Sequence, residues 1–300
     1  MPSRVTRLLQ KQAECKENIL FQKPDGVFCR ALFQVSPPVI TIAGGYAMRF
    51  RFFAAFAAAA LIALSSPLSA GAAELTVSAA ASLTNAFTEM TEAFEKKHSG
   101  VTVTTNFAAS NPLLRQIEEG APVDVFASAD QATMNKARDK KLIAESTRVN
   151  FALNDLVLIT PADSTLGLAG PNDLSGDKVQ KIAVGNPESV PAGRYAKAAL
   201  TASGLWESLA PKYIMGESVR QTLDYVSRGE VDAGIVYGTD AKQAGDKVTV
   251  AAVLSGHEPV LYPIAVIKDA RAAKEAQAFI DFVLSDEGAA ILAKYGFNKP

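Results

Sequence analysis

The fold is decided by residues 73–110, which read AELTVSAAASLTNAFTEMTEAFEKKHSGVTVTTNFAAS. This stretch begins with a strand-like run at residues 75–79 and reaches a second one at residues 101–105. Between them, residues 82–98 carry apolar side chains at the spacing of a helix face: Leu83, Ala86, Phe87, Met90, Ala93 and Phe94. Gly100 follows as the expected helix C-cap. The order strand, helix, strand predicts a βαβ unit with parallel strands.

The same alternation continues along the chain. Further strand-like runs lie at residues 123–127, 156–160, 182–184, 213–215, 233–237, 248–254 and 263–267. Helical patterns open at Asn111-Pro112 and cover residues 194–203, 219–228 and 272–295, the last with a break near residues 285–288. So many strands predict two α/β lobes with largely parallel sheets, whose ligands bind beyond the carboxyl ends of the strands.

The lobe boundaries follow from where extended segments could pass between them. We expect residues 73–157 and 259–300 to form lobe 1, and residues 158–258 to form lobe 2. The chain is predicted to cross on strands near residues 156–160 and 261–267. Two crossings of this kind make a hinge.

Five short segments carry small or hydroxyl residues, and most of them follow a strand-like run. They are residues 80–84, 107–111, 190–193, 217–220 and 235–238. A strand-to-helix junction presents free backbone N–H groups and the positive end of a helix dipole. Several junctions that converge would bind a small anion without Lys or Arg.

Charge is unevenly distributed along the chain. Residues 1–72 carry eight Lys and Arg but three Asp and Glu, which leaves 22 basic and 28 acidic residues in the remainder. A mildly acidic body has no electrostatic footprint for nucleic acid, so we expect no nucleic-acid partner. Both cysteines, Cys15 and Cys29, lie near the start, which excludes a disulfide or a thiol nucleophile in the remainder.

Residues 48–72 have the form of a secretory signal peptide. Residues 48–51 are a short basic start, residues 52–64 are an apolar run, and residues 70–72 offer a small-x-small cleavage site near Ala72. The apolar run is short for a membrane span. Residues 1–47 are expected to reflect an upstream start codon assigned in error, and the alternative is a cytoplasmic tail before a signal anchor. The mature chain is thus expected to be periplasmic.

Six motifs, in order, resemble those of the periplasmic molybdate-binding proteins of ABC importers. They are residues 78–87, residues 107–117, residues 120–130, residues 183–193, residues 234–241 and the closing residues 294–297. The match covers essentially all of residues 74–300. The resemblance implies a type II periplasmic-binding-protein fold, with two lobes that close on a ligand in the cleft. It also implies a membrane permease as partner and a chain that works as a monomer, with no enzymatic activity and no cofactor.

The resemblance further implies which groups hold the tetrahedral oxyanion. The hydroxyls of Ser82, Ser110 and Tyr237 and the backbone N–H groups of Ala192 and Val219 fall on the family's donor positions. No side chain is implied as a direct ligand of the molybdenum atom. Family members often carry further Ser or Thr after the second serine. Here residues 111–112 are Asn-Pro, and the proline removes one N–H.

An all-donor site suits molybdate, a dianion that accepts hydrogen bonds and donates none at neutral pH. Tungstate has the same charge and shape and is expected to bind nearly as well. Separation of sulfate from molybdate depends on the size of the cavity, which the sequence does not give. The motifs contain no acceptor for the proton of hydrogen phosphate.

Other polar residues are assigned structural roles. Asp124, Asp130 and Asp240 are expected to be caps and turn residues. His98 and His257 are far apart in sequence and lie in contexts that do not suit a metal pair. Three arginines near the motifs, Arg115, Arg194 and Arg220, are expected to be solvated or to bridge the lobes.

Three alternative functions remain open at this point. One is a receptor for another tetrahedral oxyanion, such as sulfate, or for a small organic acid. The second is a secreted hydrolase that uses Ser82 or Ser110, although no G-x-S-x-G motif is present. The third is the effector domain of a transcription regulator, against which the signal peptide argues.

Overall fold

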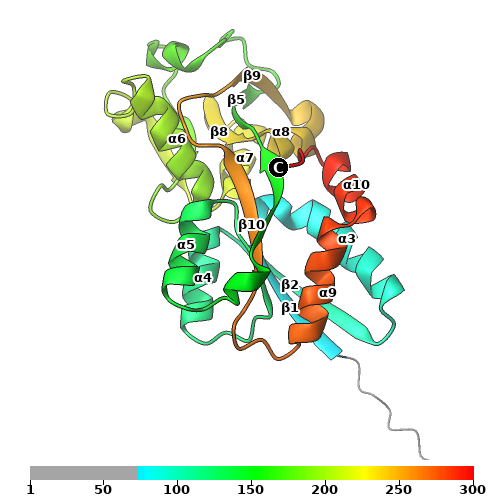
Figure 1. Cartoon of the computed structure of the whole chain (residues 1–300). Helices are drawn as coiled ribbons and strands as arrows, with labels where there is room; N and C mark the ends of the chain where they lie inside the picture. The colour runs from blue at the N-terminus through cyan, green and yellow to red at the C-terminus, as the bar shows by residue number, and fades with distance from the viewer. Residues whose placement is uncertain (1–72) are drawn as a thin grey trace, which may run out of the picture. The chain divides into compact units, whose positions relative to one another are not determined.

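The computed structural model of the chain describes residues 73–300. The predicted signal peptide and the residues before it lie outside the described residues, as do both cysteines. The described residues form two five-stranded sheets, each packed against helices (Figure 1). The predicted α/β fold with two sheets is therefore confirmed.

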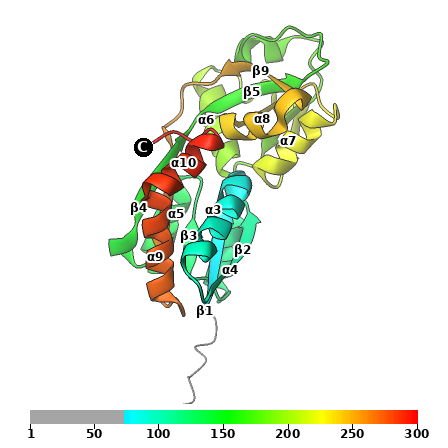
Figure 2. The ribbon, with the colours of Figure 1, turned by 90° about the vertical axis from the view of Figure 1, so that its right-hand side faces the viewer.

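The first sheet has helices on both faces. Its strand order is β2 (Val101–Ala108), β1 (Ala73–Ala80), β3 (Val125–Ala127), β10 (Val260–Val266) and β4 (Val149–Asn154). One face packs against α3 (Thr84–Lys97) and α9 (Ala273–Leu284), and the other against α4 (Ser110–Glu118) and α5 (Gln131–Asp139) (Figures 1 and 2). Phe87, Phe94 and Phe279 pack edge to face on the first side, and Leu113, Phe126 and Met134 fill the second. We call this sheet and its helices lobe 1.

The second sheet repeats the same arrangement. Its strand order is β7 (Tyr213–Gly216), β6 (Ile182–Gly185), β8 (Ala233–Tyr237), β5 (Leu156–Pro161) and β9 (Val248–Val253). Its helices are α6 (Pro191–Ala202), α7 (Val219–Ser227) and α8 (Gly238–Ala244). This sheet and its helices form lobe 2.

The prediction of largely parallel sheets is wrong for the strands that enter each lobe. The strands β1, β2 and β3 are parallel to one another, as are β6, β7 and β8. In contrast, β10 is antiparallel to β3 and β4, and β5 is antiparallel to β8 and β9. Both antiparallel strands come directly from the other lobe. They start at the junction between the lobes and run away from it, whereas the βαβ strands run toward it.

The chain passes between the sheets twice. The first passage is at Asp155, between β4 and β5, and the second is at residues 254–259, between β9 and β10. These passages lie beside the predicted segments at residues 156–160 and 261–267. The first segment lies inside β5, and the second extends one residue beyond the end of β10.

Most predicted helices are present with small shifts at their ends. A 3-10 turn, Ala81–Leu83, precedes α3, and the C-terminal helix breaks at Ser285 between α9 and α10 (Asp286–Lys294). Neither β4 nor α5 was predicted from the sequence. In β4 the burial does not alternate cleanly, and α5 buries only Thr133, Met134 and Ala137. Within residues 73–300, no helix is both long and apolar enough to cross a membrane.

Candidate functional site

The carboxyl ends of strands from both lobes meet at one small cavity. Lobe 1 contributes the residues that follow β1, β2 and β3, and lobe 2 contributes the first turns of α6 and α7 together with the end of β8. The space between its atoms is about 190 Å³, part of it open to solvent, of which about 10 Å³ can take the centre of a water molecule. Its described lining is entirely uncharged: Ala80, Ala81, Ser82, Ala109, Ala129, Val190, Pro191, Ala192, Val219 and Tyr237. The structure therefore brings four of the five predicted site residues to a single cavity.

Ser82 reaches the cavity from the 3-10 turn that follows β1. The turn directs its side chain inward, and Ser82 is buried. Its Oγ lies 2.9 Å from the Oη of Tyr262, a residue of β10. Neither Tyr262 nor its neighbour Asn154 was predicted from the sequence as part of the site. A tyrosine before Pro263 and an asparagine between two strands carry no local signal that links them to Ser82.

Ser110, the fifth predicted residue, lies just behind the cavity wall. It is the first residue of α4 and is fully buried, and its flanking neighbour Ala109 lines the cavity together with Ala129. The Ser110 Oγ accepts a hydrogen bond of 3.0 Å from the N–H of Ala129. The hydroxyl hydrogen of Ser110 is therefore free for another acceptor.

Two helix N-termini of lobe 2 supply backbone donors. Ala192 is the second residue of α6 and Val219 is the first residue of α7, and the first N–H groups of a helix have no partner inside it. Neither amide forms a hydrogen bond with another described residue. Ser218 caps α7 by accepting from the N–H of Gln221, so the capping side chain leaves the N–H of Val219 free.

Tyr237 completes the cavity from the end of β8. It is 1% exposed, and its Oη has no hydrogen-bond partner within residues 73–300. Burial raises the pKa of the Tyr237 hydroxyl well above its usual value, so the group keeps its proton at neutral pH. A buried hydroxyl without a partner is costly, which marks this atom as a donor that a ligand would satisfy.

A buried ion pair lies beside the cavity. Arg220 Nε is 2.7 Å from Oδ1 of Asp240, whose side chain is fully buried. Burial outweighs the attraction of Arg220 and raises the pKa of the Asp240 carboxyl from 3.8 to about 6. Asp240 also accepts from the N–H of Tyr237, as expected of a cap. The pair cancels its own charge and leaves the cavity wall neutral.

Side chains also join the two lobes around the cavity. Arg194 of α6 donates through Nε to Asp130 Oδ2 at 2.7 Å and through Nη2 to Thr133. The Arg220 Nη2 donates to the carbonyl oxygen of Ser82 at 3.3 Å. Asn111 donates to the carbonyl oxygen of Glu188 at 2.7 Å. The bridging role predicted for Arg194 and Arg220 is confirmed.

The predicted cap role of Asp130 is also confirmed, and the histidines take part in backbone contacts. Asp130 caps α5, and Asp124 accepts from the N–H groups of Thr76 and Ala272. The ring nitrogens of His98 and His257 lie against backbone carbonyls, not against Ser82 or Ser110. The hydrolase alternative thus lacks a base beside its serine. Residues 73–300 contain no group of three or more His, Cys, Asp or Glu placed to hold a metal ion.

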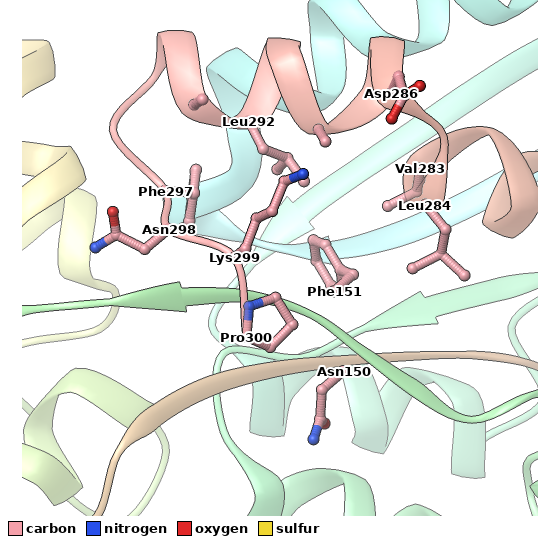
Figure 3. Close-up of a pocket in the computed structure, with 12 residues that line it drawn as sticks. Asn150, Phe151, Val283, Leu284, Asp286, Leu292, Phe297, Asn298, Lys299 and Pro300 are labelled. Carbon is pink, nitrogen blue, oxygen red and sulfur yellow. The ribbon is translucent and has the colours of Figure 1, made fainter.

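A larger hollow of about 930 Å³ lies elsewhere, against α10 and the C-terminal residues (Figure 3). Phe151, Leu292 and Phe297 contribute apolar surface to it, and Asp286 stands at its edge. The hollow is lined by one side-chain carboxylate, Asp286 at the first residue of α10, and by one ammonium group, Lys299, and no second helix N-terminus is among its described lining residues. Its described lining therefore lacks the converging helix N-termini that the sequence predicts for the anion.

The chain is similar to several known solute-binding proteins. The family model described as bacterial extracellular solute-binding protein matches residues 75–298. The molybdate-binding protein ModA of Escherichia coli is 43% identical over 231 residues, which cover 75% of this chain and 89% of that protein. The Bacillus subtilis lipoprotein YvgL, whose name assigns it to substrate binding for an ABC transporter, is 39% identical over 75% of this chain and 86% of its own length.

Among solved structures, the periplasmic molybdate-binding protein of Azotobacter vinelandii has the same fold. It superimposes with a TM-score of 0.68 over 75% of this chain and 99% of its own, at 24% identity.

Proposed function

The chain belongs to the bacterial extracellular solute-binding proteins, and from that premise we propose that it captures molybdate and delivers it to the permease of an ABC importer. The observation that carries the proposal is the donor set of the cavity between the lobes. Its polar groups are hydroxyls and free backbone N–H groups, with no charged side chain in the described lining. The identity of 43% to a molybdate-binding protein supports the choice of ion.

The binding residues are proposed to be Ser82, Ser110, Ala192, Val219 and Tyr237. Each offers one hydrogen that a tetrahedral oxyanion accepts. Hydrogen bonds to a charged group contribute about 1.5–3 kcal/mol each, so five of them supply roughly 7–15 kcal/mol. Lobe closure and desolvation of the ion oppose this.

Neutral donors also suit release to a transporter. A guanidinium in direct contact with the dianion would add a strong charge-assisted bond that the permease must break. In this chain the arginines nearest the cavity are engaged elsewhere, Arg220 with Asp240 and Arg194 with Asp130. The anion is thereby held by dipoles alone.

The proposal extends to tungstate and to the cellular setting. Tungstate shares the charge and shape of molybdate and is proposed to bind with similar affinity. The signal sequence predicted at residues 48–72 would place the mature chain outside the cytoplasmic membrane, where a solute-binding protein meets its permease. The mature chain is proposed to work there as a monomer.

Replacing Ser82 with alanine tests one donor. The variant is expected to lose one charge-assisted hydrogen bond, which weakens molybdate binding by about 1.5–3 kcal/mol. Calorimetric titration of residues 73–300 measures the change, with thermal unfolding as the check that the fold is intact. Unchanged affinity would remove Ser82 from the site.

A competition titration with molybdate, tungstate, sulfate and phosphate tests the function as a whole. Molybdate and tungstate are expected to bind tightest, and hydrogen phosphate is expected to bind weakest because the site offers its proton no acceptor. Tighter binding of sulfate than of molybdate would make the chain a sulfate receptor, and binding of none of the four would refute the proposal.

A further inference from the structure

A buried chain of hydrogen bonds leads away from Ser82 to residues outside the cavity. The Ser82 Oγ lies 2.9 Å from Tyr262 Oη, and Tyr262 Oη lies 3.2 Å from Asn154 Nδ2. Asn154 Nδ2 also lies 2.8 Å from Thr239 Oγ1. All four side chains are buried, but only Ser82 lines the cavity. The chain runs along the first passage between the lobes, since Asn154 ends β4.

The Asn154 amide determines which groups donate and which accept in this chain of hydrogen bonds. Its Oδ1 accepts from the N–H of Asp155 at 2.9 Å and from the N–H of Thr239 at 3.4 Å. Backbone N–H groups only donate, so they fix which end of the amide is oxygen. The Nδ2 end therefore faces Tyr262 and Thr239 and donates to both.

Tyr262 in turn donates its hydroxyl hydrogen to Ser82. Because its Oη already accepts from Asn154, its own hydrogen is satisfied when it is donated to Ser82 Oγ. The reverse arrangement would leave the hydrogen of a fully buried tyrosine without a partner, at a cost of about 1–3 kcal/mol. Burial also raises the pKa of Tyr262 well above its usual value, so the hydroxyl remains protonated.

The hydrogen of the Ser82 hydroxyl is therefore not donated to Tyr262. It is available to a ligand in the cavity, which the Ser82 side chain lines. Ser110 also acts as an acceptor toward the protein and keeps its hydrogen, although its partner is a backbone N–H group. Its Oγ accepts the N–H of Ala129, which cannot accept in return. Each serine therefore accepts a hydrogen bond from a protein group, Tyr262 for Ser82 and the N–H of Ala129 for Ser110, and keeps its own hydrogen for another acceptor.

We propose that Tyr262 and Asn154 are positioning residues that hold Ser82 as a donor, and that this arrangement selects oxyanions that carry no proton. The inference rests on the proposed function, because it deepens the specificity of that same site. A ligand that brings its own hydroxyl needs an acceptor. Tyr262 occupies one of the two acceptor positions of Ser82 Oγ, so Ser82 keeps a single acceptor position for such a ligand. The ligand class is the fully deprotonated tetrahedral dianion.

A double-mutant cycle between Tyr262 and Ser82 tests this arrangement in the folded chain. Tyr262→Phe keeps the ring, which packs edge to face on Phe151, Tyr237 and Phe297, and removes only the hydroxyl. Molybdate affinity is expected to fall about tenfold in Tyr262→Phe and about 10- to 150-fold in Ser82→Ala. The double variant is expected to bind no more weakly than Ser82→Ala alone.

The selectivity between molybdate and hydrogen phosphate distinguishes a positioning role of Tyr262 from a purely structural one. In Tyr262→Phe the Ser82 hydroxyl is free to rotate and accept, so the preference for molybdate over hydrogen phosphate is expected to shrink. The matched control is Tyr213→Phe, which also removes one hydroxyl bond, to the carbonyl oxygen of Trp206, but in lobe 2 away from the cavity. That control is expected to retain both affinity and selectivity.

The outcomes separate this inference from the function beneath it. Losses that add in the double variant, or wild-type affinity in Tyr262→Phe, would overturn the positioning role while leaving the molybdate site standing. Failure of the wild-type protein to bind any of the four oxyanions would overturn both. If Tyr262→Phe does not fold, Asn154→Asp replaces the donor by an acceptor in the same shape. That variant is expected to weaken binding more in the wild-type background than in Ser82→Ala.

Discussion

Replacing Gly193 with alanine is expected to abolish measurable molybdate binding and to destabilise lobe 2 by about 3 kcal/mol or more. The reason is the close approach of α6 to β6. An alanine Cβ at position 193 would lie 2.5 Å from the carbonyl carbon of Gly185, closer still to its oxygen, and 3.0 Å from the carbonyl carbon of Asn186. These are backbone atoms at the end of a central strand, so they cannot rotate away. The helix must shift, and with it the N–H of Ala192.

The matched control for this prediction is Gly238→Ala. Gly238 also lies in the first turn of a helix at the end of a strand, but its nearest neighbour to an added Cβ is 3.7 Å away. The control is expected to change affinity by less than about threefold, because no atom has to move. Calorimetric titration and chemical unfolding measure both variants. Normal binding by Gly193→Ala would show that the N-terminus of α6 does not hold the anion.

Replacing Arg220 with methionine is expected to destabilise the protein by about 3–5 kcal/mol at pH 7. The variant leaves the fully buried carboxylate of Asp240 without its counter-charge. Asp240 would then fold in its neutral form, and keeping it neutral becomes more costly as the pH rises above its unfolded pKa. Removal of Arg220 also breaks the bond to the carbonyl oxygen of Ser82, so lobe closure weakens as well.

The contribution of Asp240 to stability is expected to fall as the pH rises. Burial raises the folded pKa of Asp240 to about 6 in the wild-type chain, so its contribution to stability is full below about pH 4 and is lost as the pH rises through 6. In Arg220→Met the folded pKa lies higher still, and the loss continues above pH 6 at up to about 1.4 kcal/mol per pH unit. Urea unfolding at pH 5 and pH 7 measures it, and the variant is expected to regain stability at pH 5.

A double variant separates charge from packing in this pair. Arg220→Met with Asp240→Asn removes both charges while keeping an acceptor for the N–H of Tyr237. Its stability at pH 7 is expected to exceed that of Arg220→Met and to lose the pH dependence that Asp240 contributes, since replacing both partners of a buried pair is often near neutral. A double variant as unstable as Arg220→Met at both pH values would attribute the loss to packing instead.

Much of the fold is predictable because the βαβ segments have clear local patterns. Residues 73–110 show strand, helix and strand periods in one run, and the structure places β1, α3 and β2 there. The direction of the strands that follow a passage between the lobes cannot be predicted from local patterns. Their direction depends on which lobe the chain has just left, and that is a property of the whole topology. The apolar runs in β5 and β10 look the same whether they pair parallel or antiparallel.

The candidate site divides in a similar way. Ser82, Ala192, Val219 and Tyr237 lie in motifs that the family resemblance singles out, and the structure gathers them around one cavity. Tyr262 and Asn154 act from behind Ser82 through contacts that span 180 and 108 positions of sequence. Side-chain contacts over such separations leave no mark on local pattern, so only the three-dimensional structure brings these residues into the site.

Uncharged donors from both lobes are proposed to surround a dianion of four oxygens. The most direct test is a crystal structure grown with molybdate, in which the anomalous scattering of molybdenum locates the ion. One peak is predicted between Ser82, Ala192, Val219 and Tyr237, with hydroxyl and N–H groups in contact with its oxygens. A peak against the guanidinium of Arg194 or Arg220, or in the hollow beside α10, would show that the anion is not held by uncharged donors in the cavity between the lobes.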